Sequence, residues 1–202
     1  MSSFRQLMMK KKGGGKTYVL NSNIVNQGNM NVSTGEISGF SSTAFLYATS
    51  VFGSFPINDI DIHFKSGNDI TTEQCILSIT IYYNGQYYKY GSFVIKNNKL
   101  FYVNQNNLSE TELVNINTNT EYRITGNITS SGSSTYFHNC TIYENTTILY
   151  NSTITFSVPT VPTGTKNLYY GIIREGANSY TKPFLGIIYG DTNWKGTICV
   201  EE

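Results

Sequence analysis

The chain has 202 residues and a mass of 22.6 kDa, enough for one large domain or two small ones. Its 14 Lys and Arg against 13 Asp and Glu give a net charge of +1, which excludes the basic surface of a nucleic-acid-binding protein. Charged residues make up only 13% of the chain and aromatic residues 14%, the opposite of a disordered composition. Its 23 Asn, 20 Ser and 24 Thr favour strands and turns over helices, and no apolar run is long enough to span a membrane.

The first 15 residues form a segment of their own, predicted to dock on a partner. Phe4, Leu7 and Met8 stand at i, i+3 and i+4 and give one short apolar stripe, which Met9 extends. Arg5 and the lysines from Lys10 onward flank this stripe, and three glycines at 13–15 predict a flexible hinge. The segment does not fit a signal peptide, because its lysines follow the apolar cluster instead of preceding it.

The glycines at 13–15, followed by Lys16 and Thr17, resemble the end of a phosphate-binding P-loop. The full GxxxxGK[ST] motif needs a glycine where Lys10 stands, and it opens a helix. Here Lys16 leads into the strand-like run 18–20, so we do not expect nucleotide binding or any other cofactor.

From residue 16 onward the sequence predicts short strands joined by polar turns. Residues 59–64 alternate polar and apolar side chains, and residues 75–82 do the same. Asn84-Gly85 predicts a type I′ hairpin turn, and Asn97-Asn98 a second turn that completes a three-strand meander. Gly91 is expected at a bulge, since otherwise the apolar side changes face within the strand. Further strands are predicted at 122–125, 136–143, 146–150, 153–157, 167–173, 184–189 and 197–200.

About a dozen strands without helices predict an all-β antiparallel sandwich over residues 16–202. The three cysteines, Cys75, Cys140 and Cys199, each lie in a strand-like run, and none belongs to a CxxC pair. We expect buried, reduced thiols, because an odd number of cysteines argues against a secreted disulfide framework.

Several short segments carry a resemblance to a known fold family, the concanavalin A-like or laminin-G-like jelly-roll domain. They are 59–65, 91–103, 121–125, 153–157, 167–171 and 183–188. The resemblance runs from Ile37 to the end, about four-fifths of the chain, and implies an antiparallel jelly roll with no particular function.

The leader Met1–Met9, followed by lysines and glycines, resembles openings of virion proteins from crAss-like phages of gut Bacteroidetes. This resemblance implies a virion structural protein, either a head fibre or a capsid decoration, assembled in the host cytoplasm and displayed on the virion surface. Residues Phe4, Arg5, Leu7, Met8, Met9 and Lys10 would dock on the major capsid protein or another virion protein. Docking by so short a peptide favours a homo-oligomer, a dimer or trimer. The alternatives are a tail or baseplate component and a carbohydrate-binding adhesion module.

We expect no catalytic activity. Glycoside hydrolases of the resembled fold need two carboxyl groups about 5–9.5 Å apart. Their Glu-x-Asp-x-x-Glu pattern is absent, and Glu110 and Glu112 fall in a predicted loop. Neither histidine stands beside a nucleophile motif, so no Ser-His-Asp triad is indicated. His138 is predicted to be a core or interface histidine with satisfied ring nitrogens.

Asp59, Asp61 and His63 alternate along one strand and are expected on one face. They could hold a structural metal or a sugar hydroxyl. One extended strand supplies too few convergent ligands for a first-row metal, so an ordinary polar face is the simpler interpretation, and no metal is assigned.

Aromatic residues give the candidates for a contact surface. Tyr82 and Tyr87 are expected to be opposite each other across the Asn84-Gly85 hairpin, on a face shared with Ser78 and Thr80. Such a pair could bind a glycan or protein, or simply stabilise the hairpin. Trp194, in a polar turn before the last strand, could be an exposed recognition aromatic or could close the end of the sandwich.

Overall fold

The computed structural model describes residues 16–49, 57–83, 86–104, 109–130, 135–157, 165–176, 178–194 and 196–202. The docking segment 1–15 and its predicted hinge therefore lie outside the described residues. The strands are β1 Tyr18–Leu20, β2 Ile24–Gln27, β3 Glu36–Ile37, β4 Phe45–Thr49, β5 Ile57–Lys65, β6 Gln74–Tyr83, β7 Gln86–Lys96, β8 Lys99–Asn104, β9 Ser109–Asn115, β10 Glu121–Ser130, β11 Thr135–Glu144, β12 Thr147–Ser157, β13 Thr165–Tyr170, β14 Ile173–Arg174, β15 Tyr180–Thr181, β16 Ile187–Tyr189 and β17 Cys199–Glu201. A search of the same residues for a helix able to cross a membrane finds none.

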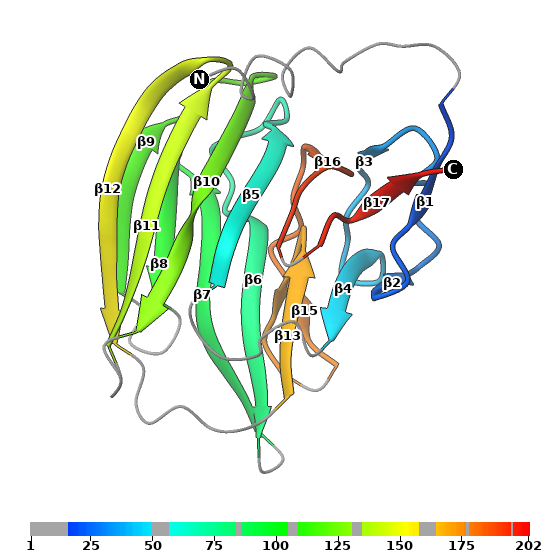
Figure 1. The fold of residues 1–202 in the computed structure, drawn as a ribbon, viewed down its shortest axis with the longest axis horizontal. Helices are drawn as coiled ribbons and strands as arrows, with labels where there is room; N and C mark the ends of the chain where they lie inside the picture. The colour runs from blue at the N-terminus through cyan, green and yellow to red at the C-terminus, as the bar shows by residue number, and fades with distance from the viewer. Residues whose placement is uncertain are drawn as a thin grey trace.

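Two large antiparallel sheets make up the sandwich, which confirms the predicted all-β fold. One has six strands in the order β12-β11-β10-β5-β16-β3, and the other has seven in the order β2-β4-β13-β6-β7-β8-β9. In Figure 1 the six-stranded sheet lies over the seven-stranded sheet. The C-terminal strand β17 pairs with β1, so the two ends of the described chain lie side by side.

The core lies between the sheets and follows the alternation seen in the sequence. Ile60, Ile62 and Phe64 of β5 are at most 1% exposed. Phe93 and Leu168 of the seven-stranded sheet belong to the same apolar cluster. The three cysteines are free and buried, as predicted. Burial raises the pKa of the Cys140 thiol to about 12, so this thiol stays protonated at neutral pH.

His138 belongs to this core, but its predicted satisfied state is wrong. Its ring is 0% exposed and meets Phe93 and Tyr102 edge-on, with centroids 5.5 and 5.7 Å apart. Neither ring nitrogen has a hydrogen-bond partner within the described part of the chain. The reason is local: the register partners of His138 are Ile128 and Ile154, and the rings of Phe93 and Tyr102 pack on it from the other sheet.

The turns follow the sequence closely. The register pairs Tyr82 with Tyr87 and Tyr83 with Gln86, as the Asn84-Gly85 hairpin requires. Asn97 and Asn98, between β7 and β8, have φ angles of 50° and 62°, the left-handed pair of a type I′ turn. The β6–β7 register shifts beside Gly91, which confirms the predicted bulge. A Cβ at Gly91 would lie 2.2 Å from the Tyr102 hydroxyl, so this close approach needs glycine.

Two segments, one over the seven-stranded sheet and one beside β5, place the candidate sites. The β14–β15 hairpin lies against the seven-stranded sheet, where Ile173 packs with Cys75, Val94 and Val103 in a second small apolar cluster. Residues 190–193, after β16, lie beside β5, with Asp61 and Asn193 exchanging backbone hydrogen bonds of 2.9 and 2.6 Å.

Candidate functional site

Tyrosines gather on the outer face of the seven-stranded sheet. Tyr47 of β4 lies directly opposite Tyr169 of β13, and their rings stack with centroids 5.7 Å apart and an interplanar angle of 25°. Tyr180 of β15 approaches from the covering hairpin, 6.0 Å from Tyr169 and 4.3 Å from Phe45. Tyr47 and Tyr180 are partly buried, whereas Tyr169 is 0% exposed.

Arg174, on β14, holds this aromatic group together. Its guanidinium carbon lies 5.6 Å from the centroid of Tyr169 and 5.4 Å from that of Tyr180, within cation–π range. Its Nη1 donates to the Tyr169 hydroxyl, and its Nε donates to the Gly176 carbonyl at 3.0 Å. Burial raises the pKa of Tyr169 more than Arg174 lowers it, so the phenol keeps its proton at neutral pH.

Buried polar atoms without partners lie beside Tyr169. Asn167 of β13 and Thr80 of β6 are register partners, 7% and 1% exposed. The Asn167 Oδ1 and Thr80 Oγ1 atoms have no hydrogen-bond partner among the described residues. The Asn167 Nδ2 donates to the Tyr169 hydroxyl at 3.4 Å, so that oxygen already accepts from Asn167 and Arg174. The proton of the Tyr169 hydroxyl takes part in neither of these two bonds.

We call these six residues, Tyr47, Thr80, Asn167, Tyr169, Arg174 and Tyr180, the tyrosine face. It combines two partly buried tyrosines, Tyr47 and Tyr180, with a hydroxyl donor and an amide acceptor that are buried and still have hydrogen-bonding capacity. Leaving such buried groups unpaired costs free energy. Arg174 carries the face's positive charge but already donates to two oxygen atoms.

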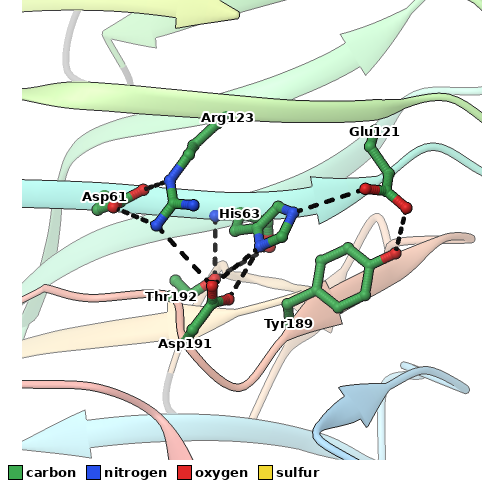
Figure 2. Close-up of polar contacts among 7 residues, drawn as sticks. All are labelled: Asp61, His63, Glu121, Arg123, Tyr189, Asp191 and Thr192. Carbon is green, nitrogen blue, oxygen red and sulfur yellow. Dashed lines mark hydrogen bonds and ion pairs between the residues drawn. The ribbon is translucent and has the colours of Figure 1, made fainter. Parts of the chain in front are cut away.

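A second polar group, the His63 cluster, lies on the outer face of the six-stranded sheet (Figure 2). Its residues come from β5, β10, β16 and the segment after β16: Asp61, His63, Glu121, Arg123, Tyr189, Asp191 and Thr192. The Arg123 side chain is 3% exposed, and its Nε and Nη2 donate to the two Asp61 carboxylate oxygens at 2.5 Å each. Its Nη2 also lies 3.8 Å from Asp191.

His63 sits between two carboxylates in this cluster. Its Nδ1 lies 2.9 Å from Asp191 and its Nε2 4.0 Å from Glu121, while the Tyr189 ring packs on the imidazole at 4.2 Å. Burial alone would raise the pKa of Asp191, but the His63 hydrogen bond and the charges of His63 and Arg123 outweigh it and lower that pKa. The Tyr189 hydroxyl donates to Glu121 at 3.1 Å.

The His63 cluster attaches the segment after β16 to strand β5. The Thr192 hydroxyl donates to the His63 carbonyl and accepts from the His63 backbone N–H, each at 3.0 Å. Together with the Asp61–Asn193 backbone bonds, these contacts hold residues 190–193 on the sheet. Each carboxylate of the cluster contacts a donor within it, so the cluster satisfies itself and offers little to a ligand.

The predicted common face of Asp59, Asp61 and His63 is only partly right. Asp61 and His63 share a face, but Asp59 has a φ angle of 59°, next to an irregularity in the β5–β10 register. That left-handed residue breaks the alternation. A search of the described residues for three or more His, Cys, Asp or Glu side chains able to hold a metal ion finds none.

The predicted aromatic candidates differ in outcome. Trp194 is 1% exposed and belongs to the core cluster, so the expectation of an exposed recognition aromatic is wrong, and the alternative of an end-closing side chain fits. The polar residues around it in the sequence belong to the turn, while the indole packs inward. Tyr82 and Tyr87 are register partners as predicted, but their side chains lie outside the described part of the structure.

The docking residues Phe4, Arg5, Leu7, Met8, Met9 and Lys10 also lie outside the described residues. The sequence analysis missed Tyr47, Asn167, Tyr169 and Arg174. Nothing in the sequence shows that β4 and β13, more than a hundred residues apart, are adjacent strands.

Comparisons with known proteins add only distant structural neighbours. No family model matches the chain, and no curated protein sequence matches it. One solved structure, scytalido-glutamic peptidase with a peptide-based transition-state analog, is 9% identical with a TM-score of 0.35, over 88% of this chain and 76% of that one. Another, alginate lyase AlgAT5 from polysaccharide lyase family 7, is 11% identical with a TM-score of 0.39, over 92% and 82%.

These neighbours correct one prediction and leave another without support. The prediction that the chain is not an enzyme is wrong as it stands, because the solved structures that it resembles are a peptidase and a lyase. At such low identity and TM-score the likeness extends to the β-sandwich and gives no reaction or substrate. Nothing in these comparisons links the chain to phage virion proteins.

Proposed function

We propose that the protein binds a neutral oligosaccharide on its tyrosine face. The observation that carries the proposal is the conjunction, at one place, of stacked tyrosine rings and buried polar atoms without partners. Sugars present apolar C–H faces that pack on aromatic rings, and their hydroxyls both donate and accept hydrogen bonds. The Tyr169 hydroxyl donor and the Asn167 Oδ1 acceptor are buried, so the proposal requires the covering β14–β15 hairpin to shift when the sugar binds.

Charge favours a neutral sugar over an acidic one. A polyanionic glycan would need cations with donors to spare, but Arg174 already donates to Tyr169 and to the Gly176 carbonyl. On the same outer face, Lys96 pairs with Glu110 and Lys99 pairs with Glu112, so those charges cancel. The site is thus rich in hydrogen-bonding groups and poor in net charge.

The virion role implied by the leader remains a prediction, because it depends on residues 1–15. A glycan-binding sandwich would suit a displayed virion protein, a tail component or a free adhesion module equally well. Deletion of residues 1–15 tests the attachment separately, since a docking role requires that particle incorporation be lost while glycan binding persists.

The test of glycan binding is an array of neutral and acidic oligosaccharides probed with the full chain, followed by calorimetric titration of the strongest hit. Tyr47→Ala removes the more accessible ring of the stacked pair and is expected to weaken binding about tenfold, the effect of losing about 1.4 kcal/mol. Asn167→Asp, which keeps the shape but adds charge, is expected to weaken it as well.

Thr153→Ala, on the outer face of the six-stranded sheet, is the matched control and should bind like the parent chain. The double variant Tyr82→Ala/Tyr87→Ala asks whether the site extends along the β6–β7 hairpin. A flat array, or a strongest hit whose affinity is unchanged in Tyr47→Ala, contradicts the proposal.

A further inference from the structure

An open pocket lies at one end of the sandwich, where three connections between strands meet. They are residues 66–73 between β5 and β6, the turn 97–98 between β7 and β8, and residues 116–120 between β9 and β10, at the upper end of the sandwich in Figure 1. The pocket has a volume of about 630 Å³, within the usual range for small-molecule sites. We call it the end pocket. The described residues that line it belong neither to the tyrosine face nor to the His63 cluster.

Backbone hydrogen bonds between the three connections fix the shape of the end pocket. The Asn98 N–H donates to the Ile70 carbonyl at 2.9 Å, and the Ile116 N–H donates to the Asn98 carbonyl at 2.8 Å. Within the first connection, the Asp69 carboxylate accepts from the Thr71 backbone N–H at 2.8 Å and closes a turn. The walls are therefore in place before any ligand arrives, so binding would need little ordering of the protein.

Exposed asparagines supply most of the polar lining: Asn68, Asn98, Asn115 and Asn117. Two of them are used in part by the protein itself. The Asn68 Oδ1 accepts from Asn119 at 2.6 Å, and the Asn117 Nδ2 donates to Glu144 at 2.8 Å. Within the described part of the chain, that leaves the Asn68 Nδ2, the Asn117 Oδ1 and the whole amides of the other two for a ligand. A free amide offers two donors and an acceptor oxygen.

The lining disfavours acidic and apolar ligands. Asp69 is the charged side chain among its described residues, so an anion would find no cation there. Hydrogen bonds from Thr72 and Thr71 hold the pKa of the Asp69 carboxyl well below its usual value, so it stays ionised and repels acidic ligands. Ile70 and Ile116 also line the pocket, but they are only 6% and 3% exposed and offer an apolar ligand little surface.

Cations and extended peptides fit no better. A calcium ion takes about six to eight oxygen ligands, whereas the described lining has one carboxylate, and the Asp69 Oδ1 already accepts from Thr71 and Thr72. A peptide that adds a strand needs free backbone groups at an edge, but the N–H and carbonyl of Asn98 are bonded to the neighbouring connections. A neutral ligand with many hydrogen-bonding groups remains.

We propose that the end pocket binds one residue of a neutral carbohydrate, as a site separate from the tyrosine face. A sugar carries a hydroxyl on most of its carbon atoms, and each hydroxyl both donates and accepts, so one sugar residue can bond to several amides at once. No aromatic ring stands among the described lining residues, so hydrogen bonds supply the affinity. A single sugar residue is therefore expected to bind in the millimolar range.

NMR titration of the isotope-labelled full chain with glucose, galactose, mannose and N-acetylglucosamine tests the proposal. At least one of these sugars is expected to shift the N–H signals of Asn98 and Ile116 saturably, with a Kd of about 1 to about 10 mM. Glucuronate, an acidic sugar, is expected to bind at least about tenfold more weakly because the Asp69 carboxylate repels it.

Asn98→Gly removes one amide and preserves the turn, because glycine readily adopts the left-handed φ of 62° found at Asn98. Combined with Asn115→Ala, which truncates a second exposed amide, it is expected to weaken binding at least about tenfold. Asn145→Gly is the matched control and should bind like the parent chain. Asn145 is also a left-handed turn residue, with a φ of 52°, but lies between β11 and β12 and does not line the pocket.

Tyr47→Ala separates this site from the tyrosine face, because it should leave the sugar-induced shifts of Asn98 and Ile116 unchanged. Saturable shifts at Tyr169 and Arg174 without any at the end pocket would support glycan binding on the tyrosine face and overturn the end-pocket proposal. Shifts that do not saturate, or that persist in Asn98→Gly/Asn115→Ala, overturn it as well. So do saturable shifts of Asn98 and Ile116 with calcium chloride alone and with none of the sugars, since they would assign the pocket to a cation.

Discussion

Replacing His138 with leucine is expected to stabilise the protein in acid by roughly 3 kcal/mol more than at neutral pH. The imidazole is 0% exposed, and neither of its nitrogens has a hydrogen-bond partner among the described residues. Burial therefore lowers its pKa from 6.5 to about 4, since the charged form would have no compensation in the apolar core.

The direction of the pH effect follows from which state binds the proton. Below pH 6.5 the unfolded chain protonates this histidine, whereas the folded chain does not until the pH approaches about 4. Stability is thus lost as the pH falls from 6.5 towards 4, and the loss amounts to roughly 3 kcal/mol for a shift of this size. Leucine binds no proton, so the variant should lack this slope. At neutral pH it should be equal in stability or slightly better, because two unpaired nitrogens are removed.

The measurement is urea unfolding of the parent chain and His138→Leu at several pH values between about 4 and about 7. Phe93→Leu, which truncates a ring in contact with His138, is the control. It should lower stability by a similar amount at every pH and keep the parent's slope. A His138→Leu variant that loses stability in acid as steeply as the parent would show that this imidazole does not cause the acid sensitivity.

Local patterns in the sequence predicted many of the strands and turns, but the loop predicted around Glu110 and Glu112 is wrong, because these residues lie in strand β9. Asn97-Asn98 specifies its hairpin through two left-handed residues, a property of the dipeptide itself, and the register on either side of Asn84-Gly85 is that of a two-residue hairpin. The alternation around Ile60, Ile62 and Phe64 predicted the buried side of β5 correctly, because apolar residues at every second position mark the buried side of a strand.

Local sequence patterns did not predict contacts between segments that are far apart in the chain. The sequence places Asp61 and His63 on one face, but their partners Arg123 and Asp191 are 62 and 128 residues further along the chain. Which strands are adjacent depends on how the sheets are connected, and no local periodicity contains that information. For the same reason the sequence could not show that Tyr47 and Tyr169 lie opposite each other on adjacent strands.

Two single residues, Trp194 and Asp59, were misjudged for a related reason. Trp194 stands among polar neighbours, but a turn needs only some of its side chains to face solvent, and the large indole gains the most from burial. Asp59 breaks the predicted alternation because its backbone is left-handed next to a register shift. Neither effect leaves a signature in residue spacing.

Arg123→Leu is expected to destabilise the protein by about 3–5 kcal/mol, the usual cost of removing one partner from a buried ion pair. Burial would lower the pKa of Arg123, but the Asp61 hydrogen bonds and charge outweigh it, so the guanidinium stays charged in the fold. Without it, the Asp61 carboxylate, whose side chain is only 20% exposed, remains beside Asp191 with no cation bonded to it.

Urea unfolding measures the total loss, and the double variant Arg123→Leu/Asp61→Leu shows its origin. If the cost comes from an uncompensated carboxylate, the double variant should recover much of it, because both charges are then absent. Lys99→Ala, which breaks an ion pair whose side chains are 38% and 52% exposed, is the control and should cost less than about 1 kcal/mol.

Hydrogen exchange shows whether Arg123 holds the segment after β16 against β5 or only contributes to packing. Because the His63 cluster holds residues 190–193 against β5, Arg123→Leu should speed exchange at the Asn193 N–H, which donates to the Asp61 carbonyl. Amides in the β6–β7 hairpin, on the opposite sheet, should respond only as much as global stability falls. Uniformly faster exchange would mean that Arg123 supports the whole sandwich and has no particular role in holding residues 190–193. A selective effect on the Asn193 N–H identifies the ion pair as the group that keeps this segment folded onto the sheet.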